Sequence, residues 1–165
     1  MPEFDTSHVK SIVLMGHAGS GKTTLAECML FEAGLISRKG NIAEKTTVSD
    51  YHALEQERGN SIFSTLLHTK WRGYKINIID TPGYDDFMGE VVSALRVADT
   101  GIMLLNASAG VEVSTDILWQ YAEDFKTPII FAVNKLDDEH ADFEKTVLEA
   151  KNHFGNKITV VQYPL

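Results

Sequence analysis

A stretch of eight residues near the N-terminus has the residue types of a phosphate-binding loop. Residues 16–23 read Gly-His-Ala-Gly-Ser-Gly-Lys-Thr, which matches the pattern G-x-x-x-x-G-K-[ST] in full. Gly16 and Gly21 permit backbone angles that a β-carbon would block, so that several N–H groups can converge on one phosphate. Lys22 adds a point charge, and the Thr23 hydroxyl is a hard ligand suited to Mg²⁺. The predicted nucleotide contacts are His17, Ala18, Gly19, Ser20, Gly21, Lys22, Thr23 and Thr24.

A carboxylate ends a second apolar run. Asp80 closes residues 76–80, which read as a strand. The C-terminal ends of neighbouring parallel strands share one edge of a sheet, so Asp80 should lie near Thr23 and hold the metal through water. Gly83 would offer its N–H to a γ-phosphate, which makes its segment a candidate switch. The alternative is an aspartate that caps the next helix, a role that two acidic residues just downstream fill better.

A third motif carries groups that can recognise a base. Asn134-Lys135-Leu136-Asp137 follows an apolar strand. The Asp137 carboxylate can accept two hydrogen bonds from guanine, whereas adenine offers no such pair of donors. Asn134 can brace the loop and reach the base, and the Lys135 stem can cover a ring face. The phosphate loop alone indicates a nucleoside triphosphate. The three motifs together, in this order and each at a strand end, indicate GTP or GDP with Mg²⁺ rather than ATP.

Strands and helices alternate along the chain. Strands are predicted at 9–15, 61–71, 74–80, 100–106, 128–134 and 158–162, and helices after the phosphate loop, from about 87, around 117–125 and at 143–154. The pattern predicts an α/β fold of the P-loop NTPase type, with three layers and a mostly parallel sheet. The strands 61–71 and 74–80 should form a hairpin that adds one antiparallel edge strand. Residues 37–60 are predicted to be a long mobile loop.

Composition limits the class of protein. The chain has 165 residues, 44% of them apolar and 23% charged, which suits one domain with a core. The formal net charge of −8 argues against independent nucleic-acid binding, which would need a basic face. Cys28 is the single cysteine, which fits a reducing compartment. No apolar run approaches the ~20 residues of a membrane span. We expect a cytoplasmic monomer without membrane contact.

The sequence resembles the translational GTPases of the elongation factor G type, over residues 9–165. The segments that carry the resemblance are 55–59 (EQERG), 74–83 (YKINIIDTPG), 93–99 (SALRVAD), 109–112 (AGVE) and 134–137 (NKLD). The resemblance implies a multidomain cytoplasmic factor that acts on the ribosome with GTP. It implies a tail at 1–8 and a GTP-binding domain at 9–165, cut before the fifth guanine-binding loop. It also implies that residues 37–60 form the first switch and that Gly83 begins the second, both ordered by the γ-phosphate.

Several positions depart from the family pattern. The family has Ile-Thr-Ile where this chain has Asn60-Ser61-Ile62, so Ser61 keeps a hydroxyl for Mg²⁺ while Asn60 replaces an apolar residue of a water gate. Ala18 is small where the other side of that gate would stand, and Gly19 replaces an aspartate. Tyr84 stands where the family histidine positions the attacking water. The implied metal ligands are Thr23, Ser61 and Asp80, and the implied catalytic groups are Lys22 and Tyr84.

Three functions remain open from the sequence. The first is a ribosome-dependent GTPase. The second is a GTP-responsive binding module that hydrolyses GTP slowly or not at all, which the departures at Tyr84 and Asn60 favour. The third is a P-loop kinase for a small molecule. Such kinases usually carry an arginine-rich lid and have no need of a guanine-reading motif.

Overall fold

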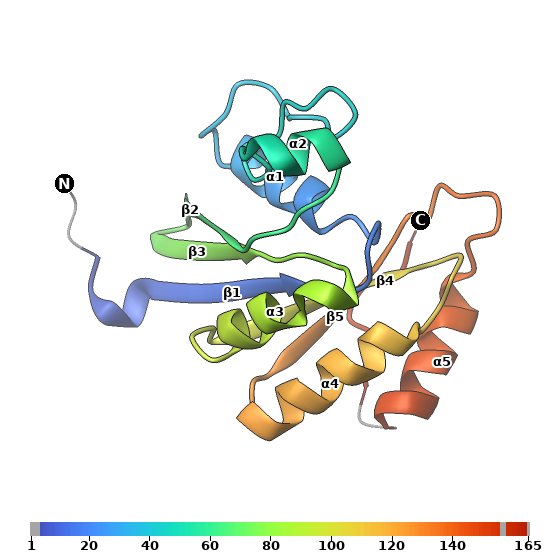
Figure 1. The fold of residues 1–165 in the computed structure, drawn as a ribbon. Helices are drawn as coiled ribbons and strands as arrows, with labels where there is room; N and C mark the ends of the chain where they lie inside the picture. The colour runs from blue at the N-terminus through green and yellow to red at the C-terminus, as the bar shows by residue number, and fades with distance from the viewer. Residues whose placement is uncertain (1–3, 156–157, 165) are drawn as a thin grey trace.

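The computed structural model describes residues 4–155 and 158–164. Its five-stranded sheet has the order β2-β3-β1-β4-β5, and every neighbouring pair is parallel except β2–β3. Figure 1 shows α1 and α2 on one side of this sheet and α3, α4 and α5 on the other. The predicted architecture, a mostly parallel α/β sheet with one antiparallel edge strand, is confirmed. The strands are β1 (Val9–Met15), β2 (Thr65–Trp71), β3 (Tyr74–Asp80), β4 (Thr100–Asn106) and β5 (Ile129–Asn134).

The helices follow the expected order. The α-helices are α1 (Lys22–Glu32), α2 (Ala53–Arg58), α3 (Met88–Leu95), α4 (Val113–Phe125) and α5 (Phe143–Phe154), and two short 3-10 helices are η1 (Thr6–His8) and η2 (Asp85–Phe87). The segment expected as a tail thus contains η1 in its described part, and residues 1–3 lie outside the described residues. None of the helices built from the described residues is long and apolar enough to cross a membrane.

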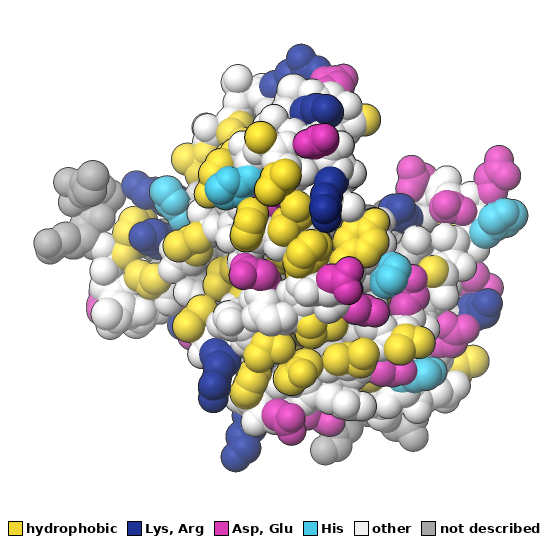
Figure 2. Space-filling model, in the orientation of Figure 1, with side chains coloured by type: hydrophobic (Ala, Val, Ile, Leu, Met, Phe, Trp, Pro, Cys, Tyr) yellow, Lys and Arg dark blue, Asp and Glu magenta, His cyan; other side chains and the backbone are white. Residues whose placement is uncertain are grey.

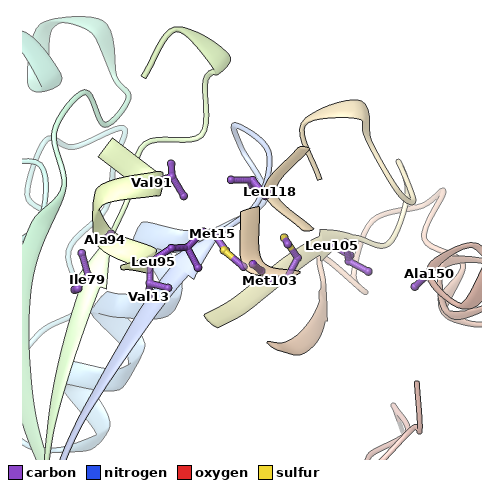
Figure 3. Close-up of a cluster of buried hydrophobic side chains, with 11 residues drawn as sticks. Val13, Met15, Ile79, Val91, Ala94, Leu95, Met103, Leu105, Leu118 and Ala150 are labelled. Carbon is purple, nitrogen blue, oxygen red and sulfur yellow. The ribbon is translucent and has the colours of Figure 1, made fainter. Parts of the chain in front are cut away.

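Two apolar clusters hold the three layers together. Successive side chains of a strand point to opposite faces of the sheet, so β1 serves both clusters. Val13 and Met15 face α3, α4 and α5, where they pack in one cluster with Leu95 and Leu118 (Figure 3). Leu14 faces α1, where the second cluster lies. The central strand is therefore buried from both sides, and its C-terminal end is fixed where the phosphate loop begins.

The first switch segment differs from the prediction because it contains a helix. The capping box of His52 and Glu55 begins α2, and Gly59, in a left-handed conformation, ends it. The hairpin also begins later than predicted, at Thr65, and its tight turn at Arg72 and Gly73 has the positive φ angles of a two-residue connection.

The predicted strand at 158–162 is wrong, since the described residues 158–164 form no strand. Ile158 packs against the larger apolar cluster, whereas Val161 is 86% exposed. An alternation of apolar and polar residues indicates which side chains are buried. A segment without regular secondary structure can bury alternate side chains in the same way. A strand also needs a backbone partner, which the pattern does not specify. The segment instead lines an apolar groove of about 1290 Å³ beside β5 and α5.

Candidate functional site

The phosphate loop connects β1 to α1 and turns through left-handed glycines. Gly16 has φ of 136° and Gly21 has φ of 101°. A β-carbon at Gly16 would lie 2.5 Å from the carbonyl oxygen of Leu104 on β4. Only glycine can lie this close to β4. The chain can therefore turn sharply at the end of β1, and the N–H groups of the loop converge near the start of α1.

The ammonium group of Lys22 points back into the loop. Its Nζ atom donates hydrogen bonds to the carbonyl oxygens of Gly16 at 2.8 Å and His17 at 2.9 Å. The side chain is buried, and burial lowers the pKa of Lys22 to about 8, although the charges of Asp80 and Glu112 oppose this shift. A phosphate bound in the loop would meet a cation that the loop already holds in place.

Polar side chains from three segments meet beside the start of α1. The hydroxyl oxygens of Thr23 and Ser61 lie 3.3 Å apart. The Ser61 hydroxyl donates to Oδ1 of Asp50 at 2.7 Å, and the Ser49 hydroxyl donates to Oδ2 of Asp80 at 2.6 Å. The structure thus brings together the three residues predicted as metal ligands, and it adds two residues that the sequence analysis did not predict.

One oxygen of the Asp80 carboxylate is free to bind a ligand. Within the described part of the chain, its buried Oδ1 atom has no hydrogen-bond partner. Burial raises the pKa of Asp80 to about 6, although the hydrogen bond from Ser49, the nearby Thr23 hydroxyl and the charge of Lys22 oppose this shift. Burial also raises the pKa of Asp50. A cation beside Asp80 would compensate this desolvation, so the residues present fit a divalent metal.

The donor set favours Mg²⁺ over a transition metal. The described residues contain no group of three or more His, Cys, Asp or Glu side chains arranged to hold a metal. What they offer instead is two hydroxyls and one or two carboxylates. Mg²⁺ binds proteins through few carboxylates and completes its shell with water and phosphate oxygens, which suits this arrangement.

The base-recognition motif follows β5 and reaches the phosphate loop. The Nδ2 atom of Asn134 donates to the carbonyl oxygen of Ser20 at 2.8 Å, which is the bracing contact expected from the sequence. Lys135 has a left-handed conformation, with φ of 58°, and lines the cavity described next. Asp137 is exposed on the following turn and does not line that cavity.

A cavity of about 370 Å³ lies between the phosphate loop, the segment around Ser61 and Lys135. Its lining residues are Ala18, Gly19, Gly21, Lys22, Thr23, Thr24, Ile42, Asp50, Gly59, Asn60, Ser61, Gly83, Tyr84 and Lys135. Gly83 packs directly on the phosphate loop, because a β-carbon there would lie 2.7 Å from Cα of Ala18. Tyr84 is 47% exposed at the same cavity.

Comparisons with known proteins place this arrangement in a family. The family model described as the elongation factor Tu GTP binding domain matches residues 7–163. The chain belongs to this family. Its members bind guanine nucleotides, so the GTP-binding domain predicted from the three motifs is confirmed at that level, as is the resemblance to elongation factor G-like proteins.

Relatives and a solved structure support the assignment. The chain is 40% identical over 158 residues to an elongation factor G-like protein of Thermotoga maritima, and 40% identical over 158 residues to the mitochondrial ribosome-releasing factor 2 of Candida dubliniensis. These alignments cover 96% of this chain but 22% and 20% of the relatives. A crystal structure of a protein from Thermus thermophilus matches with a TM-score of 0.86 at 34% identity, covering 90% of this chain and 22% of that one. The chain therefore spans about a fifth of the length of these proteins.

Several polar residues of the GTP-binding domain carry no signal in the sequence. Ser49 and Asp50 lie in a loop without periodicity, and their partners are distant in sequence, so no local signal marks them. Glu27 is also buried, and it accepts hydrogen bonds from the backbone N–H groups of Gly40 at 2.8 Å and Val48 at 2.6 Å. No local signal marks Glu27, because α1 has no clear apolar face and the partners of Glu27 are distant in sequence.

His17 does more than fill space in the phosphate loop. Its Nδ1 atom lies 2.9 Å from the Ser114 hydroxyl, and its Nε2 atom lies 3.4 Å from a carboxylate oxygen of Glu112. Both partners lie at the start of α4. These contacts connect the loop of the GTP-binding domain to the helix that follows β4.

Proposed function

We propose that this domain binds GTP and GDP together with Mg²⁺ and acts as a nucleotide-dependent switch within a larger factor that works on the ribosome. The observation that carries the proposal is the meeting of three motifs at one edge of the sheet. The phosphate loop, the Asp80 carboxylate and the Asn134 loop come from separate strands, and Asn134 is hydrogen-bonded to the phosphate loop. Elongation factors and ribosome-releasing factors among the relatives support the ribosomal role.

Each group has a role in this proposal. Lys22 and the loop N–H groups hold the β- and γ-phosphates. Thr23, Ser61 and Asp80 hold the metal, which neutralises phosphate charge when bound. Asp137 accepts two hydrogen bonds from guanine, while Asn134 braces the loop and Lys135 covers the ring. His17, Ala18, Gly19, Ser20, Gly21, Thr24 and Gly83 complete the nucleotide contacts.

The domain itself should have no general affinity for nucleic acid. On the face shown in Figure 2, Lys and Arg side chains are interspersed with Asp and Glu. The net charge of −8 agrees with this mixed surface. Nucleic-acid binding without sequence preference depends on a clustered basic face. We therefore propose that contact with the ribosome depends on local features of the whole factor.

Hydrolysis of GTP should be slow. Phosphoryl transfer in this class depends on positioning and on charge stabilisation around the attacking water. The Tyr84 phenol borders the cavity and can orient a water through its oxygen, but it brings no positive charge to the γ-phosphate. Asn60 lies in the same cavity and offers an amide where the family has an apolar side chain. These two residues favour the second candidate, a GTP-responsive binding module with little turnover.

Calorimetric titration with GTP, GDP and ATP in the presence of Mg²⁺ tests the proposal. A charge-assisted pair with guanine contributes about 1.5–3 kcal/mol, so GTP and GDP should bind roughly 10- to 100-fold more tightly than ATP. Equal affinity for GTP and ATP would contradict guanine recognition. Single-turnover hydrolysis by the full-length factor, with and without ribosomes, then separates the two candidates, since a binding module shows almost no turnover in either case.

A further inference from the structure

Ser49 and Asp50 connect the first switch segment to both sides of the proposed metal site. The Ser49 hydroxyl donates to Oδ2 of Asp80 at 2.6 Å. The next residue, Asp50, accepts the hydrogen bond of Ser61 at 2.7 Å, and the Ser61 hydroxyl lies 3.3 Å from that of Thr23. Two consecutive residues of one loop therefore hold one carboxylate and one hydroxyl of the site.

Ser49 is itself fixed at a second point. Its carbonyl oxygen accepts a hydrogen bond from the Thr65 hydroxyl at 3.0 Å. Thr65 and Asp80 are direct partners across the β2–β3 hairpin, so residue 49 lies across the end of that hairpin. The side chain is buried, with 2% of its surface exposed. Ser49 thus contacts Thr65 at the start of β2 and Asp80 at the end of β3. These two contacts leave the Ser49 hydroxyl little freedom.

We propose that Ser49 is a positioning residue of the metal site. The Ser49 hydroxyl donates a hydrogen bond to Oδ2 of Asp80. This bond directs Oδ1, which has no partner in the described chain, towards the cation. Groups that hydrogen-bond a metal ligand commonly fix its orientation in this way. The proposal rests on the proposed function, because it concerns the same Mg²⁺ site.

The same contacts hold the first switch segment closed. The hydrogen bonds of Ser49 and Asp50, and that of the Val48 N–H with Glu27, all join protein groups. None of them uses a γ-phosphate oxygen. We therefore expect residues 47–52 to stay on the site with GDP as well as with GTP, in contrast to the implication of the resemblance that the γ-phosphate orders the whole segment.

The competing explanation is that Ser49 only stabilises the loop. Metal affinity separates the two, measured by titrating the GDP complex with Mn²⁺ as a paramagnetic substitute for Mg²⁺. Ser49→Ala should weaken Mn²⁺ binding by about 10- to 100-fold, the usual cost of removing a partner of a metal ligand. Ser49→Thr keeps the hydroxyl and should restore most of the affinity.

Ser64→Ala is the matched control. The Ser64 hydroxyl is also buried, three residues after Ser61, but it has no hydrogen-bond partner among the described residues. Ser64→Ala removes an Oγ atom, as Ser49→Ala does, but from the residue that precedes β2. It should leave the Mn²⁺ affinity within about twofold of the wild-type value. Mn²⁺ affinity of Ser49→Ala equal to that of this control would overturn the positioning role.

Amide exchange provides an independent measurement on the wild type. Residues 47–52 should be similarly protected with GDP and with a non-hydrolysable GTP analogue, and Ser49→Ala should lose this protection in both the GDP-bound and the nucleotide-free protein. Loss of protection in wild type with GDP would overturn the closed segment, even if Ser49→Ala fails to fold. A wild type that binds no GDP contradicts the proposed function instead, and Mn²⁺ titration of the nucleotide-free wild type and Ser49→Ala then still tests the positioning role.

Discussion

The phosphate side and the base side of the proposed nucleotide site are built differently. On the phosphate side, Lys22, Thr23 and Asp80 are buried and held by hydrogen bonds or close contacts. On the base side, Lys135 and Asp137 are exposed. Groups that are already ordered lose little entropy when a ligand binds, whereas exposed side chains must be ordered. We therefore expect the phosphate side to determine how tightly a nucleotide is held, and the base side to determine which nucleotide is held.

Lys22→Ala should have the largest effect and should not discriminate among nucleotides. Losing one partner of a buried, hydrogen-bonded charge pair costs about 2–5 kcal/mol, so affinity for GTP, GDP and ATP should each fall roughly 30-fold to several-thousand-fold. Calorimetry measures the affinities, and circular dichroism confirms the fold. A variant that keeps the wild-type affinity for GTP would show that the loop does not hold the phosphates.

Tyr84→His asks whether the phosphate side also limits chemistry. A well-placed acid-base group is worth about 10²–10⁴-fold in rate. In the full-length factor the substitution should recover only part of this, roughly 10- to 100-fold in ribosome-stimulated single-turnover GTP hydrolysis, because Asn60, Ala18 and Gly19 also depart from the family pattern. Nucleotide affinity should stay unchanged. Rapid hydrolysis by wild type that persists in Tyr84→Phe would mean that Tyr84 only packs against the second switch.

The smallest expected effect is proton uptake by Lys22. Burial lowers its pKa to about 8, so the neutral amine is substantially populated above that pH, and bound phosphate favours the ammonium form. At pH 8.5, binding should take up most of one proton, measured by calorimetry in buffers of different ionisation enthalpy. At pH 7 Lys22 is already charged. Lys22→Arg is the control, because the guanidinium stays charged at both pH values. Equal proton uptake by wild type and Lys22→Arg at pH 8.5 would argue against a neutral Lys22.

The two sides also differ in what the sequence could predict. Gly16 and Gly21 encode the phosphate loop locally, because their backbone angles follow from their own residue type. Asn134 reaches the loop because parallel strands end at a common edge. Ser49 was not predictable in this way, since its contact with Asp80 spans 31 residues within an aperiodic segment.

The remaining errors have related physical causes. Helix α2 depends on a capping box between His52 and Glu55, a short signal within a polar loop. Glu55 is also fully buried, and its carboxylate accepts hydrogen bonds from the N–H groups of Ile62 and Phe63. The amino-acid composition does not indicate these contacts. The strand predicted at 158–162 failed for the opposite reason, because an apolar pattern was present but the described residues 158–164 pair with no strand.

Guanine recognition by Asp137 is the central claim, and a single specificity exchange tests it most directly. Asp137→Asn replaces an acceptor by a group that can donate to the additional carbonyl of xanthine. Competition titration of wild type and variant with GTP and xanthosine triphosphate should show GTP affinity falling roughly 10- to 100-fold while affinity for xanthosine triphosphate rises. Unchanged preference for GTP in the variant would contradict the account.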